Sequence, residues 1–160
     1  MASIRVGFGY DVHVLEQGKD FYLGGMKIPG DKGAVGHSDA DVLIHAICDA
    51  LLGAAGLRDI GVYFPNTDPQ WKNADSKILL EKVVKAVAEK KYRVGNLDAT
   101  ICLENPKINP HISEMKKILS QILNISVDDI SIKATTSEKI GFVGREEGVI
   151  AYAVVLIESV

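Results

Sequence analysis

The stretch SIRVGFGYDVHVL (residues 3–15) is typical of a β-strand that is interrupted by Gly7 and Gly9. In a strand, residues two apart point to the same face. Asp11 and His13 are therefore expected to project together, with the apolar residues between and beside them on the opposite face. Glycine inside a strand often marks a place where another backbone or a ligand comes close. This stretch thus predicts a strand that presents a carboxylate and an imidazole to one point.

The composition of the 160 residues is that of one globular domain, which we expect to span residues 1–160. Hydrophobic residues make up 47% of the chain and charged residues 24%, which is ordinary for a protein with a packed core. The formal net charge of −3 indicates neither a nucleic acid nor an anionic membrane as a partner. No apolar stretch approaches the roughly 20 residues that cross a bilayer, and no secretory signal is recognisable.

Beyond residue 15, the chain alternates between patterns typical of strands and patterns typical of helices. Strands are expected at 20–29, 96–106, 129–138 and 148–159, the first of them folded into a hairpin. Helices are expected at 37–57, 76–91 and 109–125, and polar or glycine-rich loops at 30–36, 58–75 and 139–148. This order predicts an α+β fold, in which a sheet carries helices packed on one face.

The helix expected at 37–57 has signals at both ends. Ser38 or Asp39 is expected to cap its N-terminus, and acidic residues occupy its expected first turn. Gly56 follows its expected last turn, where glycine commonly ends a helix.

A polar stripe on this helix supplies a third candidate metal ligand. Asp41, His45 and Asp49 are spaced by four residues and therefore share one face. The two carboxylates are expected to orient the imidazole by accepting its second N–H. Asp11, His13 and His45 would then form a set of two histidines and one carboxylate. Three protein ligands leave one tetrahedral position open, as in catalytic zinc sites.

The residues alone leave other interpretations open. A single helical histidine is more often a satisfied structural residue than a ligand, and the Asp-x-His pair on a strand is a weak signal. Cys48 lies three residues after His45, so it either reaches the same side or serves only in packing.

Two further polar segments are candidates for phosphate binding. His37 and Ser38 precede the helix, where Ser38 either caps it or joins His37 in meeting a phosphate at its N-terminus. In KATTSEK (133–139), three hydroxyls stand beside Glu138 and two lysines. This combination suits a phosphate with a divalent cation, or else it is a polar strand exit. Turns or ligand-contacting loops are expected at FPNTD (64–68) and LENPK (103–107).

Five motifs, in order along the chain, resemble the 2-C-methyl-D-erythritol 2,4-cyclodiphosphate synthase family. They are GYDVH (9–13), GHSDADVLIHAICDALLGAAGLRDIG (36–61), FPNTDP (64–69), ENPKI (104–108) and KATTSEKIGFVGREEG (133–148). The resemblance covers essentially the whole chain. Its most specific parts are the start of the helix, with its histidine, and the last of the five motifs.

The resemblance implies an intramolecular phosphoryl transfer in the non-mevalonate isoprenoid pathway. The substrate would be 4-diphosphocytidyl-2-C-methyl-D-erythritol 2-phosphate, whose 2-phosphate attacks the β-phosphorus of its own diphosphate. CMP would leave, and an eight-membered cyclic diphosphate would form. Positioning and charge neutralisation dominate such a transfer, and its nucleophile is already anionic, so it needs no general base.

The resemblance also implies which residues bind metal. Asp11, His13 and His45 would hold zinc or another divalent ion whose open position takes a β-phosphate oxygen. Glu138 would hold a magnesium or manganese ion that bridges the α- and β-phosphates.

By the same resemblance, His37 and Thr136 are the catalytic residues that position or stabilise the reacting phosphates. Contacts with the sugar parts are implied for Asp59 and Gly61, and contacts with the erythritol side for Phe64, Pro65, Asn66, Thr67 and Asp68. Contacts with the cytosine and its phosphate are implied for Leu103, Glu104, Asn105, Pro106, Lys107, Ile108, Asn109 and Thr135, and substrate contacts also for Ser38, Ile60 and Ser137.

For the fold, the resemblance implies a ferredoxin-like or chorismate-mutase-like arrangement assembled as a homotrimer. Adjacent subunits would share active sites, and the sheets would face the threefold axis. Phe142 and Arg145 match positions that line an axial cavity for an isoprenoid diphosphate. An arginine there suits a diphosphate head and a phenylalanine suits its tail, although a purely structural axial contact is the alternative.

The chain departs from the family pattern at two positions. Phe8 stands where the family often has a histidine, and Asn66 stands where it frequently has an aspartate. A neutral Asn66 side chain still hydrogen-bonds a hydroxyl, so we expect a working site with slightly altered substrate contacts.

Two rival functions remain open on sequence alone. One is a zinc phosphoesterase that uses water as the nucleophile and releases a linear product. The other is a trimeric isoprenoid-diphosphate-binding protein with a vestigial catalytic site, which predicts lost ligands, whereas all four metal-ligand candidates are present. We expect a cytoplasmic bacterial protein, or one of the plastid stroma if a transit peptide has been removed.

Overall fold

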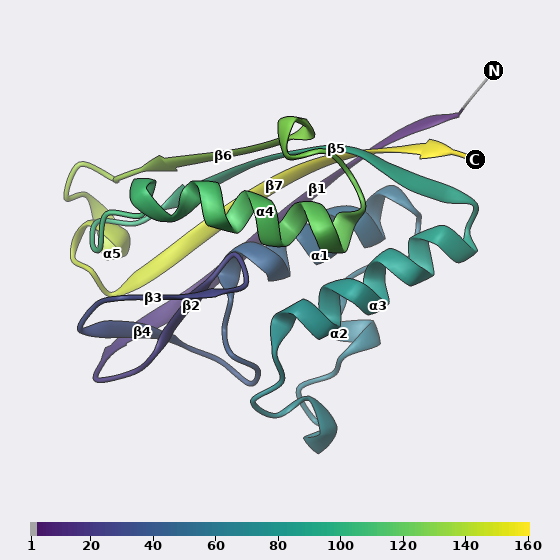
Figure 1. Cartoon of the computed structure of the whole chain (residues 1–160). Helices are drawn as coiled ribbons and strands as arrows, with labels where there is room; N and C mark the ends of the chain where they lie inside the picture. Colours follow the sequence, from purple (N-terminus) through teal and green to yellow (C-terminus); the bar gives the residue numbers. More distant parts are fainter. Residues whose placement is uncertain (1–2) are drawn as a thin grey trace.

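The computed structural model describes residues 3–160 as one mixed sheet with helices on one face (Figure 1). The five-stranded sheet has the order β4-β1-β7-β5-β6 and consists of Lys32–Val35, Ile4–Gln17, Gly148–Ser159, Tyr92–Cys102 and Ile130–Thr135 in that order. Only β5 and β6 run parallel, and the other neighbours are antiparallel. The predicted α+β fold, with helices on one face of a sheet, is confirmed.

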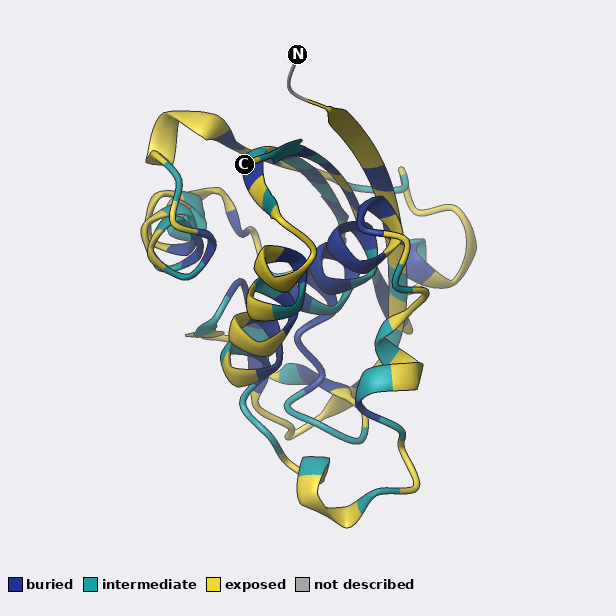
Figure 2. Ribbon diagram, turned by 90° about the vertical axis from the view of Figure 1, so that its right-hand side faces the viewer, coloured by how far each residue is buried: buried dark blue, intermediate teal, exposed yellow. Residues whose placement is uncertain are grey.

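Three longer helices form the second layer. They are α1 (Val42–Ala54), α3 (Ser76–Glu89) and α4 (Ile112–Leu123), and a two-stranded hairpin, β2 (Phe21–Leu23) with β3 (Met26–Ile28), lies beside them. Figure 2 shows α1 as an almost wholly buried helix, and ten of its 13 residues are buried. The core is therefore a single cluster built around α1, between the sheet and the outer helices.

The approach of α1 to β1 depends on two glycines. A Cβ atom on Gly9 would lie 1.8 Å from the carbonyl oxygen of Ala46, and one on Gly7 would lie 1.8 Å from that of Ala50. No side chain fits at these distances, so the helix backbone rests directly on the strand. This confirms the expectation of a close approach at the glycines, although β1 runs through both without interruption.

The N-terminus of α1 differs from the prediction. The cap is Asp41, not Ser38 or Asp39, and no acidic residue lies in the first turn. Asp41 accepts hydrogen bonds from the backbone N–H of Ile44 (3.0 Å), Gly24 (3.0 Å) and Gly25 (2.7 Å). The helix begins late because the segment before it is bonded elsewhere, as by Asp39 N–H to the Ala74 carbonyl.

Three segments expected as loops contain regular structure. Residues 30–36 include β4, which pairs with residues 14–17 of β1 and is therefore held in the sheet. The long loop at 58–75 contains the short helices α2 (Ile60–Tyr63) and η1 (Pro69–Trp71), and residues 139–148 contain α5 (Gly141–Gly144). Two further single turns are η2 (Asn109–His111), which precedes α4, and η3 (Val127–Asp129).

On the face of the sheet away from the helices, the part formed by β1 and β7 is apolar and uncovered. On β1, Val6, Phe8 and Tyr10 are 65%, 63% and 44% exposed, and on β7 Tyr152 and Val154 are 38% and 41% exposed. Phe8 and Tyr10 both pack against Tyr152, with ring centroids 6.4 and 5.4 Å apart. Exposed apolar patches of this kind mark interaction surfaces. Within residues 3–160, no helix combines the length and apolar character that crossing a membrane requires.

We expect Gly9→Ala to destabilise the protein by about 3 kcal/mol or more, because the new methyl group must push α1 off β1. Gly53→Ala is the matched control, since Gly53 lies in α1 and a methyl group added there would meet nothing within 4 Å. That change should stabilise the protein by about 0.5–1 kcal/mol through helix propensity. Urea unfolding measures both, and equal effects of the two changes would contradict the close-packing argument.

Candidate metal centre and its cavity

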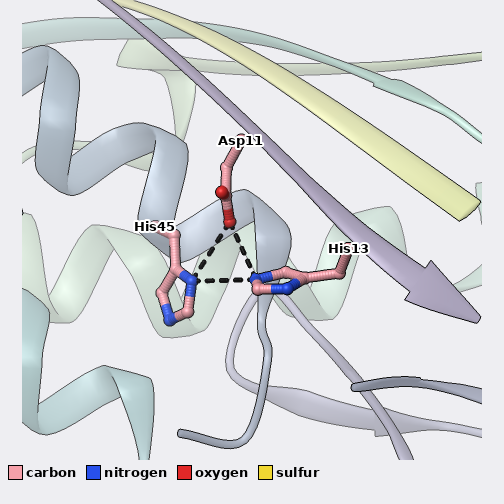
Figure 3. A group of neighbouring side chains, drawn as sticks. All are labelled: Asp11, His13 and His45. Carbon is pink, nitrogen blue, oxygen red and sulfur yellow. Dashed lines mark hydrogen bonds and ion pairs between the residues drawn. The ribbon is translucent and has the colours of Figure 1, made fainter. Parts of the chain in front are cut away.

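The three predicted metal ligands converge on one point (Figure 3). Asp11 and His13 project from β1 towards the helices, and His45 reaches them from the first turn of α1. Asp11 Oδ2 lies 2.9 Å from His13 Nε2 and 3.1 Å from His45 Nδ1, and the two nitrogens are 3.1 Å apart. Asp11 and His45 are 34 residues apart in the sequence, so β1 and α1 together supply one compact set of donor atoms.

This donor set fits a divalent metal ion. A tetrahedral zinc ion with bonds of about 2.0–2.1 Å keeps its ligand atoms about 3.3 Å apart, close to the separations seen here. Two imidazoles and one carboxylate are also donors that zinc accepts readily. Among residues 3–160 this is the one group of three or more such side chains close enough to share an ion. Cys48 is not part of it, because its side chain is fully buried in the core.

The charges at this centre are strongly coupled. Burial raises the pKa of Asp11, but hydrogen bonds and charge attraction from His13 and His45 outweigh it and lower the pKa to about 2. For His45, burial lowers the pKa, and the neighbouring Asp11 carboxylate more than offsets this and raises it. The centre therefore keeps an ionised carboxylate at neutral pH.

The second nitrogen of His45 does not meet the carboxylates that the sequence suggested. Asp41 is used in capping α1, and Asp49 accepts from the backbone N–H of Ile60 at 2.7 Å. Instead, His45 Nε2 lies 3.0 Å from both Ser38 Oγ and Ser76 Oγ. Ser76 was missed because it opens a helix 31 residues further along the chain, and no local pattern links it to His45.

A cavity of about 360 Å³ opens beside the metal centre. Six residues with predicted roles in substrate or phosphate contact line it: His37, Ser38, Ile60, Gly61, Phe64 and Asn66. Trp71 and Leu79 also line it, although the sequence did not suggest them. The Trp71 ring meets Phe64 edge-on, with centroids 4.9 Å apart, so the two aromatic side chains form one wall.

The remaining residues predicted in this region lie around the cavity and do not line it. His37 Nε2 donates to the carbonyl oxygen of Asp68 at 3.2 Å, which ties the 64–68 segment to the site. Asp59 is the residue before α2. Pro65 and Thr67 do not line the cavity.

A second cavity, of about 300 Å³, lies at the ends of β5 and β6. Seven of its lining residues were predicted to contact the cytidine phosphate or the phosphates: Leu103, Pro106, Lys107, Ile108, Asn109, Thr135 and Thr136. It shares no lining residue with the first cavity. Across the sheet, Asp11 on β1 is three strands from Ala134, which lines the second cavity, a distance of about 14 Å at the usual strand spacing.

Other predicted residues support the second cavity or lie apart from it. Glu104 accepts hydrogen bonds from the backbone N–H of Ser137 (2.8 Å) and Lys139 (3.3 Å), so it shapes the segment that carries Glu138. Asn105 Nδ2 donates to Glu146 at 2.7 Å. Glu138 is exposed and is not one of the side chains that converge at the metal centre of its own chain.

Phe142 and Arg145 lie in and after α5, near the start of β7. Phe142 is 39% exposed. Arg145 forms two hydrogen bonds of 3.1 Å with Glu147, and this exposed pair holds the guanidinium at the chain's surface.

A sequence model described as the YgbB family matches residues 4–158. The chain belongs to this family. Two of its relatives, from Bacteroides fragilis and Phocaeicola vulgatus, are named 2-C-methyl-D-erythritol 2,4-cyclodiphosphate synthase. They are 59% and 61% identical to the chain, over 99% and 98% of it and 99% and 98% of their own lengths.

Solved structures agree in fold. The bifunctional IspDF from Campylobacter jejuni matches 100% of the chain with a TM-score of 0.96 and 37% identity, and the chain spans 43% of that longer protein. A 2C-methyl-D-erythritol-2,4-cyclodiphosphate synthase in its CDP-bound form matches 96% of the chain, and 99% of its own, with a TM-score of 0.89 and 38% identity. The IspF–CDP complex from Plasmodium falciparum matches 98% of the chain and 97% of its own, with a TM-score of 0.86 and 34% identity.

Zinc at 100 times its dissociation constant should stabilise the protein by about 2.7 kcal/mol and raise its Tm by roughly 5–10 °C, because only the folded chain presents the centre. His45→Ala should abolish this zinc-dependent shift. His111→Ala is the control, since His111 lies in η2 and outside the centre, and it should keep the full shift. Thermal unfolding with zinc and with a chelator measures both, and a full shift in His45→Ala would refute the assignment.

Proposed function

We propose that this chain converts 4-diphosphocytidyl-2-C-methyl-D-erythritol 2-phosphate into 2-C-methyl-D-erythritol 2,4-cyclodiphosphate and CMP. The observation that carries the proposal is the Asp11–His13–His45 centre opening into a cavity lined by family-matched residues. Full-length relatives at about 60% identity bear this enzyme's name, and two structural relatives bind CDP. The reaction is a step in isoprenoid precursor synthesis.

In this reaction an oxygen of the 2-phosphate forms a bond to the β-phosphorus of the same molecule. The bond from that phosphorus to the CMP oxygen breaks, and CMP leaves with the electron pair. Because the nucleophile is already an anion, the protein has little proton transfer to perform. Its work is to hold two negatively charged phosphates close together and in line, which favours cyclisation over attack by water.

The Asp11–His13–His45 centre would hold zinc, and Glu138 would hold a magnesium or manganese ion. When bound, such cations neutralise charge on the phosphate oxygens of the attacking and leaving groups. The protein's own side chains would hold the phosphates in position beside these cations. His37 lines the metal cavity and would help position a phosphate there, and Thr136, in the second cavity, supplies a hydroxyl donor.

The two cavities would bind opposite ends of the substrate. The first, with Ile60, Gly61 and Asn66, would take the erythritol part beside the metal centre. The second, with Lys107 and Thr135, would take the cytidine phosphate. Because the cavities are separate within one chain, we propose that a complete site combines the first cavity of one subunit with the second cavity of its neighbour.

The uncovered sheet face supports a homotrimer as the assembly that brings the two cavities together. Its exposed side chains on β1 and β7 are aromatic or aliphatic, and burying them between subunits removes that surface from water. Phe142 and Arg145 lie in and directly after α5, a few residues before β7. On a threefold axis, their rings and guanidinium groups would suit an isoprenoid diphosphate.

Incubation with the diphosphocytidyl substrate should give two coupled cyclic-diphosphate phosphorus signals and CMP in phosphorus NMR. A zinc chelator should abolish the signals, and His45→Ala should lose nearly all turnover, at least about 100-fold. His111→Ala should retain turnover, since it lies outside both cavities. A linear product would favour a zinc phosphoesterase, and an unchanged substrate with metal present would favour a binding protein.

Val154→Lys should convert the trimer into monomers, because it places a charge in the centre of the uncovered face. Activity should be lost with the trimer, although the metal centre of each chain stays intact. Val127→Lys is the matched control, since Val127 is 39% exposed in η3 and belongs to another part of the surface. Sedimentation and turnover measure both variants, and an active Val154→Lys monomer would contradict the shared site.

A further inference from the structure

Behind the metal centre, a chain of hydrogen bonds leads away from His45. Its Nε2 atom lies 3.0 Å from the hydroxyl of Ser76, whose side chain is fully buried. The Ser76 hydroxyl donates a short hydrogen bond to Asp39 Oδ1, and the Ser76 backbone N–H donates to Asp39 Oδ2 at 2.9 Å. The Asp39 carboxylate therefore accepts hydrogen bonds from both the backbone N–H and the hydroxyl of Ser76. Neither Asp39 nor Ser76 is a ligand of the metal centre.

The direction of these hydrogen bonds follows from the number of protons available. A carboxylate only accepts, and a serine hydroxyl has a single proton to give. Because Ser76 gives that proton to Asp39, its oxygen can only accept from His45. Nε2 of His45 must therefore carry a proton.

A proton on Nε2 decides what the other nitrogen of the ring does. Nδ1 of a neutral imidazole protonated on Nε2 has a free lone pair, and a metal ion needs that lone pair. This Nδ1 atom is the one that lies 3.1 Å from both Asp11 Oδ2 and His13 Nε2. The opposite tautomer would direct an N–H into the space where the three donors converge.

We propose that Ser76 and Asp39 are positioning residues that fix the metal-binding tautomer and the ring orientation of His45. The inference rests on the proposed metal role of the Asp11–His13–His45 centre. The Asp39 carboxylate polarises the Ser76 hydroxyl, which holds the Nε2 proton, and Nδ1 stays free for the ion. Partners of this kind, behind a ligating histidine, are worth about 10–100-fold in metal affinity.

Ser38 does not supply the same constraint. Its hydroxyl also lies 3.0 Å from His45 Nε2, and it accepts from the Ala40 backbone N–H at 3.2 Å. No carboxylate within residues 3–160 accepts the Ser38 proton, so this hydroxyl is free to donate or accept and tolerates either tautomer. Ser76 is therefore the residue that selects the His45 tautomer, because it donates its only hydroxyl proton to Asp39.

Ser76 is also the first residue of α3, so a change there could act by loosening the helix. Asp75→Ala separates the two effects. Asp75 is the N-cap of α3 and accepts from the Lys77 backbone N–H at 2.9 Å, and its carboxylate pairs with the Lys77 ammonium group and not with His45. Its loss weakens the start of the helix by about 0.5–2 kcal/mol and leaves the Ser76 hydroxyl in place.

The test is the zinc dissociation constant of the folded full-length chain, measured by competition with a chelator of known affinity. Ser76→Ala should raise it by about 10–100-fold, and Asp75→Ala should leave it essentially unchanged. Equal affinity of Ser76→Ala and the unaltered protein, or equal weakening by both variants, would overturn the inference. An unaltered protein that binds no zinc would instead refute the metal assignment of the proposed function, on which the inference rests.

Nitrogen-15 NMR of the His45 ring in the zinc-loaded, unaltered protein gives a second test that needs no variant. The inference expects zinc on Nδ1 and a proton on Nε2 that exchanges slowly with water. In Ser76→Ala, the Nε2 proton should exchange faster, a change that a merely looser helix would not produce in Asp75→Ala. Zinc on Nε2, or an Nε2 atom without a proton, would overturn the inference even if Ser76→Ala does not fold.

Discussion

The direct contact between the α1 backbone and β1 at Gly7 and Gly9 positions both the core and the metal centre. With glycines at both positions, the helix lies at backbone distance from the strand, and neither can move without a clash or a gap. His45 lies one residue before Ala46, whose carbonyl meets Gly9. Asp11 and His13 follow Gly9 on the same face of β1. The packing of the core thus sets the distances at the metal centre.

The two faces of the sheet have separate tasks. The helix-covered face buries the core around α1 and holds the metal centre with its cavity. The other face keeps, on β1 and β7, an aromatic and aliphatic surface that a lone chain leaves in water. Self-association through that face would join cavities that are separate within one chain. Assembly and catalysis would therefore be linked, because each complete site would need two subunits.

Much of the candidate site was predictable from local patterns. The two-residue period of a strand places Asp11 and His13 together, and the motif order identifies the family. The expected partners of His45 were wrong, because spacing by four along a helix says which residues share a face and nothing about what packs on it. Asp41 turned inward to cap α1 and to bind the Gly24–Gly25 turn. Residues 30–36 resembled a loose loop because glycines mask a short edge strand.

The longer helices and strands, the pairing of Asp11 with His13, and the family were all readable from the sequence, since these depend on periodicity and on motifs within short windows. The groups that contact His45 Nε2 emerge only when the chain is folded. Asp39 and Ser76 are 37 residues apart, and they meet because the segment before α1 is hydrogen-bonded to the segment before α3. The direction of a hydrogen bond depends on all the donors and acceptors around it in the folded protein. The spacing of residues along the sequence does not show which groups these are.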